Sequence, residues 1–256
     1  MAADQKTLLT INELGFAVVP KVLETDQIGI LKTLLQQCID EDLARFGGKH
    51  ADAWMVQNLM VRGLPFLKLL ENPVLHEYLS ALLTDTCIVY AYTSSSLPPG
   101  GSNYSHRIHC DCPRFIPGYV TNVGVMIALD DYTDANGATY FLPGSHLTAE
   151  TPGESQFMSR AKRVYPKAGD AVIFNARTFH LGAVNSTASP RHAITMNVCR
   201  SYMRQRFDYP RLVPKELLDK IGEVGRRFLG FNVRMPTTLE EYYVPESQRL
   251  YKANQG

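Results

Sequence analysis

The segment AGDAVIFNARTFHLGAVNSTASPRHAITMNV (168–198) decides the fold that we predict for this chain. It begins with a strand of buried type, turns, returns through a short stretch that ends near His180, and opens a further strand at Arg191. Val, Ile, Phe and Thr fill the strand-like parts, and Gly, Asn, Ser and Pro separate them. We therefore expect several short strands joined by tight connections.

Segments of similar composition, rich in Val, Ile, Tyr, Phe and Thr, lie on both sides of this one. Short strands at such spacing are typical of a sandwich or a barrel, and a jelly-roll barrel suits a site at its mouth, because alternate residues of each strand point inward. The predicted strands are GFAVVPKVL (15–23), MVQNLMV (55–61), CIVYAYTSSS (87–96), YVTNVGVMIALDD (119–131), ATYFLP (138–143), RVYPKAGDAVIFN (163–175) and RHAITMNVCRSY (191–202).

Helical periodicity appears on either side of the strand-rich region. The segment 25–48 has apolar residues at helical spacing, with Thr25 as the expected N-cap and Gly47-Gly48 as the stop. The segments 73–83 and 213–230 also read as helices. The prediction is one domain, mainly β with flanking helices. Its parts are a helical region of about 1–86, a barrel core of about 87–205, and a C-terminal helix and irregular tail over 206–256.

Composition narrows the class of protein. The chain has 256 residues, 45% of them hydrophobic and 20% charged, with a formal net charge of +1. That balance gives no electrostatic case for nucleic acid or an anionic membrane as partner. Five cysteines without a CxxC pair favour a reducing compartment. No signal peptide or membrane span is evident, so we expect a cytoplasmic protein. We also expect a monomer or homodimer that binds a small-molecule substrate.

Three residues of the middle region have the chemistry of a metal site: His109 and Asp111, two positions apart, and the later His180. On a strand, His109 and Asp111 share one face and can bind one ion, whereas Cys110 points to the opposite face and is expected to pack. Two imidazoles and a carboxylate are the facial set that holds Fe(II) with open positions. Arg191, shortly after His180, supplies the cation that a dicarboxylate co-substrate requires.

The sequence resembles the phytanoyl-CoA dioxygenase family of Fe(II)/2-oxoglutarate oxygenases over roughly residues 10–235. The resemblance implies a double-stranded β-helix (jelly-roll or cupin-like) barrel. It also implies His109, Asp111 and His180 as iron ligands and Arg191 as the partner of the 2-oxoglutarate C5 carboxylate. The motifs that carry it are HCD (109–111), ALDDYTDANGATYFLPGSH (128–146), GDAVIFNARTFHLGAVNS (169–186) and PRHAITMNV (190–198).

Two further positions are candidates for 2-oxoglutarate binding. Thr139 matches a position where related enzymes place a hydroxyl on the same carboxylate, and its alternative is an ordinary β-former in a strand. Gln57 and Asn58 lie in a segment that matches a family strand near the co-substrate or substrate. They point to opposite faces of that strand, so at most one should face the pocket, and Gln57 is favoured.

Three residues before the metal motif are candidates for substrate binding. Arg107 lies two positions before His109 and shares its face on an extended strand. It is expected to hold a substrate carboxylate or phosphate, or else to lie in solvent at the barrel rim. Tyr104 and His106 belong to the loop SNYSHR (102–107), and loops at a barrel mouth commonly carry binding residues.

The expected activity is a dioxygenase reaction that consumes 2-oxoglutarate and O2 and releases succinate and CO2. It would hydroxylate an unactivated C–H bond of a small or mid-sized metabolite in secondary metabolism, with desaturation, epoxidation or cyclisation as related outcomes. One alternative is a Zn-dependent hydrolase built on the same three ligands. Such a hydrolase would give Arg191 no function. The other alternative is a non-catalytic barrel that acts as a binding module.

Overall fold

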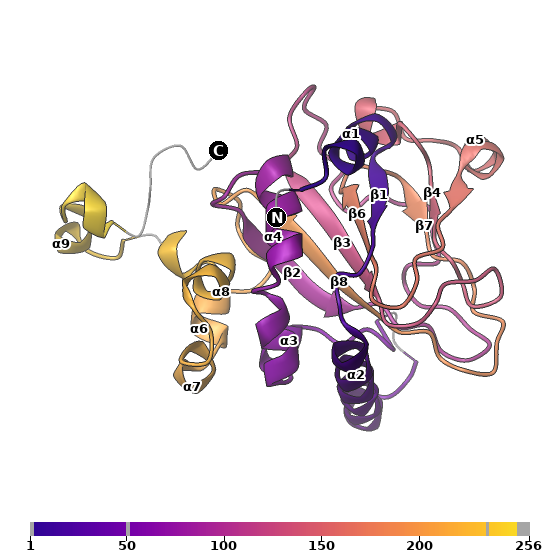
Figure 1. Cartoon of the computed structure of the whole chain (residues 1–256), viewed down its shortest axis with the longest axis horizontal. Helices are drawn as coiled ribbons and strands as arrows, with labels where there is room; N and C mark the ends of the chain where they lie inside the picture. The colour runs from indigo at the N-terminus through magenta and orange to yellow at the C-terminus, as the bar shows by residue number, and fades with distance from the viewer. Residues whose placement is uncertain (1–2, 50–51, 234–235, 250–256) are drawn as a thin grey trace.

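The computed structural model, which describes residues 3–49, 52–233 and 236–249, is a mixed structure of helices and two antiparallel sheets (Figure 1). The larger sheet has the order β1-β6-β3-β8-β2, and the smaller one has the order β5-β4-β7. The strands are β1 (Phe16–Val19), β2 (Ile88–Ser94), β3 (Asn122–Ala128), β4 (Tyr140–Phe141), β5 (Lys162–Arg163), β6 (Ala171–Asn175), β7 (His180–Leu181) and β8 (Ala193–Cys199).

The large sheet is buried on both faces, and its central strand β3 shows how. Val123, Val125 and Ile127 point to a core formed with the helices, whereas Met126 and Ala128 point to a second core between the two sheets. Every residue of β3 is buried, which explains its continuous apolar run. The period of two thus assigns one face of the sheet to helix packing and the other to the inter-sheet space.

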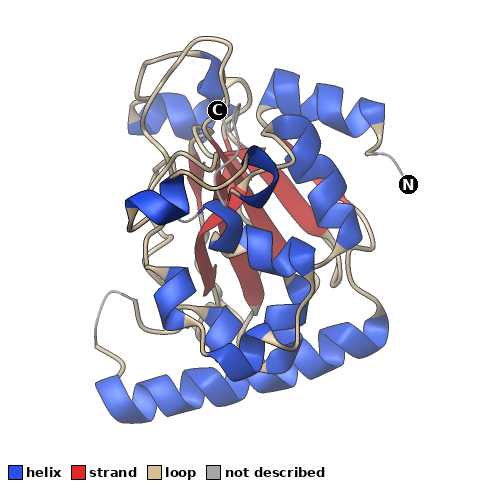
Figure 2. Cartoon of the chain, turned by 90° about the vertical axis from the view of Figure 1, so that its left-hand side faces the viewer, coloured by secondary structure: helices blue, strands red, loops and turns tan. Residues whose placement is uncertain are grey.

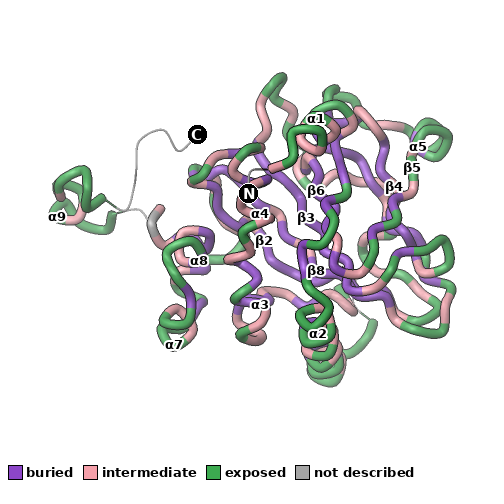
Figure 3. Tube along the Cα trace, viewed as in Figure 1, coloured by how far each residue is buried: buried purple, intermediate pink, exposed green. Residues whose placement is uncertain are grey.

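Helices lie against one side of the large sheet, and the small sheet lies on the other (Figures 1 and 2). Figure 3 shows most of the large sheet buried and much of the helices exposed. The α-helices are α1 (Gln5–Leu14), α2 (Thr25–Phe46), α3 (Leu64–Leu69), α4 (Pro73–Leu82), α5 (Glu154–Arg160), α6 (Tyr209–Leu212), α7 (Lys215–Leu218), α8 (Glu223–Phe228) and α9 (Leu239–Tyr242). Short 3-10 helices cover Leu59–Val61, Ser145–Leu147, Phe231–Val233 and Glu246–Gln248.

Helix ends in the N-terminal half follow local capping chemistry. Helix α2 is capped by Glu24 rather than by the expected Thr25, because Glu24 and Gln27 form a reciprocal capping box. Its C-cap is Gly47, as predicted. Helix α4 starts at Asn72, whose side chain accepts a 3.1 Å hydrogen bond from the backbone N–H of Leu75. These two predicted helices are confirmed, with a corrected cap for the first.

Two predicted elements are wrong. The segment 55–61 is not a strand: it makes one bridge, Gln57 to Thr93, and then enters a 3-10 helix after Asn58, which has φ 55°. The segment 213–230 is two short helices, because the N–H of Gly222 donates to the carboxylate of Glu71 at 2.7 Å and starts α8 there.

Other boundaries also differ from expectation. The segment 163–175 divides into β5 and β6, and the region 232–256, expected to be irregular, contains α9. Helices α1 and α5 were not predicted at all. Residues 250–256 of the predicted tail lie outside the described residues. In the described part of the chain, no helix is long and apolar enough to cross a membrane.

Candidate metal centre

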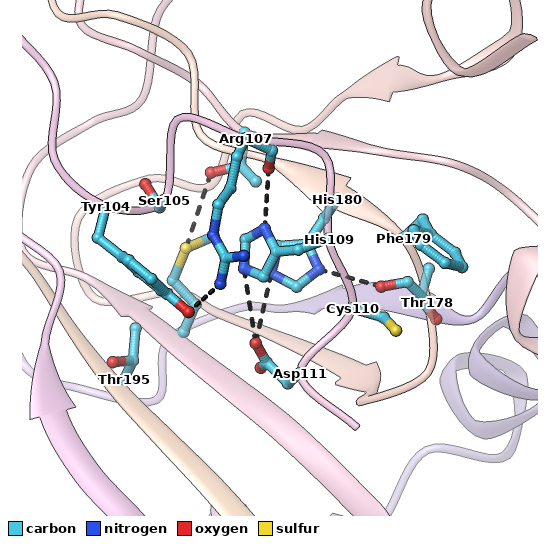
Figure 4. A network of polar contacts seen from close by, with 12 residues as sticks. Tyr104, Ser105, Arg107, His109, Cys110, Asp111, Thr178, Phe179, His180 and Thr195 are labelled. Carbon is cyan, nitrogen blue, oxygen red and sulfur yellow. Dashed lines mark hydrogen bonds and ion pairs between the residues drawn. The ribbon is translucent and has the colours of Figure 1, made fainter. Parts of the chain in front are cut away.

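The two histidines of the predicted triad face each other across an antiparallel bridge. His109 donates its backbone N–H to the His180 carbonyl at 3.0 Å, and His180 donates back to His109 at 2.8 Å. Residues that exchange both hydrogen bonds lie directly opposite, with side chains on the same face. Their ring centroids are 4.2 Å apart, and Figure 4 shows the two imidazoles side by side.

Asp111 completes the cluster from the same strand-like segment. Its Oδ1 lies 3.7 Å from His109 Nε2 and 3.8 Å from His180 Nε2. One potential ligand atom from each of the three residues lies within 4.8 Å of the others. Two atoms bound side by side to one ion at about 2.1 Å lie about 3–3.6 Å apart, so only small side-chain movements separate this cluster from a metal site.

Backbone carbonyls hold both imidazoles in the orientation that metal binding requires. His109 Nδ1 donates to the Arg107 carbonyl at 2.8 Å, and His180 Nδ1 donates to the Thr178 carbonyl at 3.0 Å. With the proton on Nδ1, each Nε2 keeps a free lone pair aimed toward Asp111. Metal-ligating histidines in proteins are commonly fixed by this type of outer hydrogen bond.

Burial keeps the metal-binding form of His109 available. Desolvation, followed by the neighbouring His180, lowers the pKa of His109 to about 4. A neutral imidazole is the form that donates its lone pair to a metal. The intervening Cys110 turns the other way: its thiol accepts from Arg177 Nη1 at 3.5 Å, and it packs on a separate cluster that contains Phe157.

Two aromatic rings support His180 from behind. The ring of Phe141 stacks on it at 5.3 Å between centroids, and the ring of Phe174 meets it edge-on at 5.1 Å. Phe174 has this position because its cross-strand partner is Gly124, where a Cβ atom would overlap the ring. Glycine is therefore required at this point of β3.

Arg191 is buried at 2% exposure and lines the same cavity of about 360 Å³ as the three metal-site residues. Its Nη2 donates to the Ser95 carbonyl at 3.2 Å, and its guanidinium lies 4.2 Å from the centroid of the Tyr132 ring. Among the described residues, Nε and Nη1 have no hydrogen-bond partner. Burial lowers the pKa of Arg191 from its usual value, while the neighbouring Tyr132 and Asp130 act in the opposite direction. No carboxylate of the described chain lies within ion-pair distance of Arg191.

The structure brings three of the other predicted site residues to this cavity. Thr139 is buried there, with its hydroxyl 3.9 Å from Met126 Sδ. Tyr104 and Arg107 are exposed cavity residues, and the Arg107 guanidinium lies 4.1 Å from the centroid of the Tyr104 ring (Figure 4).

Three predicted residues do not line the cavity. Gln57 lines a separate cavity of about 600 Å³ beside Trp54, and Met55 is the residue that borders both. Asn58 caps the 3-10 helix instead of facing the site. The His106 ring bonds to the Gly182 carbonyl at 2.9 Å in the neighbouring loop.

Several lining residues were not singled out from the sequence. Thr195 and Asn197 alternate along β8, and Thr93 lies opposite Thr195, with the two hydroxyl oxygens 2.8 Å apart. Polar residues at a period of two within an apolar strand are a signal that sequence reasoning can use. Arg206 also lines the cavity, and it follows β8 in a loop that carries no local signal.

Residues 11–193 match the protein family described as phytanoyl-CoA dioxygenase (PhyH). The uncharacterized protein Rv1501 of Mycobacterium tuberculosis is 29% identical over 255 residues, which are 96% of this chain and 93% of that protein. The dioxygenase sphC of Aspergillus fumigatus is 24% identical over 88% of this chain and 66% of its own length.

Solved structures show the same fold. AviO1 from Streptomyces viridochromogenes has a TM-score of 0.62 at 22% identity, over 78% of this chain and 96% of AviO1. SnoN, a non-heme α-ketoglutarate-dependent epimerase, has a TM-score of 0.60 at 17% identity, over 76% of this chain and 80% of SnoN. SnoN is also known in complex with Fe3+ and α-ketoglutarate.

Proposed function

The chain belongs to the phytanoyl-CoA dioxygenase family, and from that premise we propose that it is an Fe(II)- and 2-oxoglutarate-dependent dioxygenase. It oxidises an unactivated C–H bond of a small or mid-sized metabolite, in secondary metabolism, and releases succinate and CO2. The proposal includes the finer fold: the two facing sheets are the halves of a double-stranded β-helix within a single domain. The likeness to SnoN, with its Fe3+ and α-ketoglutarate, supports both parts.

The buried guanidinium of Arg191, which has no ion-pair partner among the described residues, is the observation that carries the proposal. A buried cation costs several kcal/mol unless an anion accompanies it, and here two of its nitrogen atoms, Nε and Nη1, have no partner among the described residues. A dicarboxylate that reaches from the metal cluster to Arg191 supplies that anion and can accept two parallel hydrogen bonds. A Zn-dependent hydrolase gives Arg191 no comparable role.

The three clustered side chains fit Fe(II). Two neutral imidazoles and one carboxylate form a facial set that leaves positions open for a chelating 2-oxo acid and for O2. Iron bound there would couple the oxidative decarboxylation of the co-substrate to oxidation of the substrate. His109, Asp111 and His180 are proposed as its ligands, with both histidines already oriented by their carbonyl partners.

The protein's own side chains orient the co-substrate and exclude water. Arg191 pairs with its far carboxylate, and Thr139 presents a buried hydroxyl in the same cavity. Tyr132, stacked on Arg191, covers the guanidinium and keeps water away from the ion pair. A low local dielectric strengthens such a pair, so the buried position of Arg191 makes co-substrate binding selective for a dicarboxylate.

The test begins with the protein loaded anaerobically with Fe(II). Addition of 2-oxoglutarate should give a visible metal-to-ligand absorption band, and admission of O2 should then give succinate. His109→Ala is the matched negative control. A protein that shows no band, and no more succinate than the control, would contradict the proposal and would favour a hydrolase or a binding module.

A further inference from the structure

We propose that the substrate of this site carries an anionic group, a phosphate or a carboxylate, which Arg107 and Arg206 bind at the mouth of the metal cavity. The inference rests on the proposed function, because it assigns Arg191 and the metal cluster to iron and 2-oxoglutarate. It commits to one of the two roles that the sequence left open for Arg107, the binding of a substrate anion, and it adds a second residue, Arg206, whose role the sequence did not suggest.

The cavity has an excess of positive charge. Its described lining contains three arginines, Arg107, Arg191 and Arg206, and one carboxylate, Asp111. Fe(II), Asp111 and the 2-oxoglutarate dianion together carry a net charge of about −1, so the three arginines leave an excess of about +2. A further anion in the cavity offsets this excess, and a cleft lined by one sign of charge attracts ligands of the opposite sign.

The position of Arg107 is fixed by the metal centre itself. Its carbonyl accepts the hydrogen bond from His109 Nδ1 at 2.8 Å, so the backbone that carries it is tied to a metal ligand. Its guanidinium stacks on the ring of Tyr104 and donates to the Tyr104 hydroxyl. Figure 4 shows this guanidinium next to the His109 ring and above Asp111.

Arg206 reaches the same cavity from the large sheet. Its backbone N–H donates at 3.0 Å to the carbonyl of Tyr90 in β2, and this bond docks the loop after β8 against the sheet. Both Arg206 and Arg107 are exposed, whereas Arg191 is buried. The two exposed arginines therefore lie where the cavity opens, and Arg191 lies at its closed end.

Neither exposed arginine has an acidic partner within the described chain. The ion pairs of the structure involve other cations, and the arginines among them are Arg62, Arg163, Arg211 and Arg226. A solvated surface arginine commonly stands alone too. Here two arginines without acidic partners line one cavity, and that lining contains no Glu or Lys. Together they form an anion-binding site rather than two unrelated surface residues.

The test uses inorganic phosphate and benzoate as probes of the anion site. The protein is loaded with Mn(II) and saturated with 2-oxoglutarate, and each probe is titrated at constant ionic strength. Paramagnetic relaxation of the phosphate 31P signal and of the benzoate 1H signals reports binding close to the metal. The two probes distinguish the two kinds of anion. Relaxation of the phosphate signal alone indicates a phosphorylated substrate, and relaxation of both signals indicates a site that also accepts carboxylates.

We expect saturable relaxation in the wild type and a loss of affinity of about tenfold or more for each of Arg107→Gln and Arg206→Gln, since each removes one charge-assisted contact. Arg204→Gln is the matched control: Arg204 is exposed, lies two positions before Arg206, and does not line the cavity. Its titration should equal that of the wild type.

Three results would overturn the proposal: no saturable relaxation in the wild type, equal relaxation in the Arg107→Gln/Arg206→Gln double variant, or an equal loss in Arg204→Gln. Direct ligation of the probe to Mn(II) would produce the second result. The anaerobic Fe(II) band with 2-oxoglutarate is recorded on the same proteins. A normal band without anion binding refutes only the anion site, whereas absence of the band refutes the dioxygenase function.

Discussion

Replacement of Arg191 by methionine should make the co-substrate-free protein more stable while removing its response to 2-oxoglutarate. Methionine fills a similar volume without a charge. The usual expectation for a fully buried side chain is the reverse, namely that its substitution destabilises the protein. The difference arises because two nitrogen atoms of this guanidinium lack partners within the described chain.

The magnitude follows from three contributions. Burial of an ion that has no ion-pair partner costs several kcal/mol, here taken as about 5. The hydrogen bond from Nη2 to the Ser95 carbonyl at 3.2 Å returns about 2 kcal/mol, and the stacking on Tyr132 returns about 2 kcal/mol. The substitution should therefore raise the free energy of unfolding by about 1 kcal/mol, or the Tm by roughly 2–4 °C.

Thermal unfolding of the Mn(II)-loaded protein, with and without 2-oxoglutarate, measures both effects. At a ligand concentration of one hundred times Kd, the wild type should gain about 2.7 kcal/mol, a rise in Tm of roughly 5–10 °C. Loss of the buried ion pair costs binding about 3–5 kcal/mol. At the same ligand concentration, Arg191→Met should then gain less than about 0.3 kcal/mol.

Arg177→Met is the matched control. Arg177 is also buried, but its Nη2 donates to the carbonyls of Thr148, Ala149 and Glu150 at 3.2, 2.9 and 3.2 Å. Its loss leaves these carbonyls without a donor and should destabilise the protein by about 3–5 kcal/mol, with the 2-oxoglutarate response retained. If Arg191→Met is destabilised to the same degree and still responds to 2-oxoglutarate, the reasoning is refuted.

Three further predictions address the metal centre, the packing of the large sheet and the pH dependence of stability. His109→Ala should abolish the anaerobic Fe(II)/2-oxoglutarate absorption band, and Cys110→Ala should retain it, because the two side chains point to opposite faces of the extended segment. An equal loss of the band in both variants would contradict this alternation of side chains. Gly124→Ala should cost about 1–3 kcal/mol and weaken metal binding through the facing phenylalanine ring, whereas Gly29→Ala, in open space on a helix, should stabilise by up to about 1 kcal/mol in urea unfolding. Burial lowers the pKa of His76 below its usual 6.5, so the unfolded chain binds the proton first and stability falls as pH drops below 6.5. His76→Gln should flatten that slope by at most about 1.4 kcal/mol per pH unit, and an unchanged slope would show that His76 does not contribute.

Local patterns in the sequence predict the parts of the site that depend on neighbouring residues. His109 and Asp111 share a face and Cys110 does not, because extended backbone alternates, and the structure has this arrangement. Helix α2 follows from hydrophobic periodicity, and the strands of the large sheet follow from segments rich in Val, Ile, Phe, Tyr and Thr that turn residues separate. The partner histidine, His180, was a candidate ligand from its residue type and from the family resemblance, and it lies directly opposite His109.

The misplaced elements share one physical cause, which is a contact from a distant segment. Glu71 takes the N–H of Gly222 and divides the predicted helix 213–230. Ser94 exchanges hydrogen bonds with Val56, and the chain then turns into a 3-10 helix at 59–61. Hydrophobic periodicity within either segment cannot predict these contacts, because the partner residues lie far away along the chain.

The sequence by itself determined which chemistry the site can perform, because ligand type, spacing and alternation are properties of adjacent residues. The tertiary structure decided which groups share the cavity. It brings Arg206 to the cavity that contains the three metal-site residues, directs Gln57 to a neighbouring cavity, and buries Arg191 without an ion-pair partner among the described residues. These outcomes depend on how two sheets pack and which carbonyls lie within reach, and only the folded chain sets those distances.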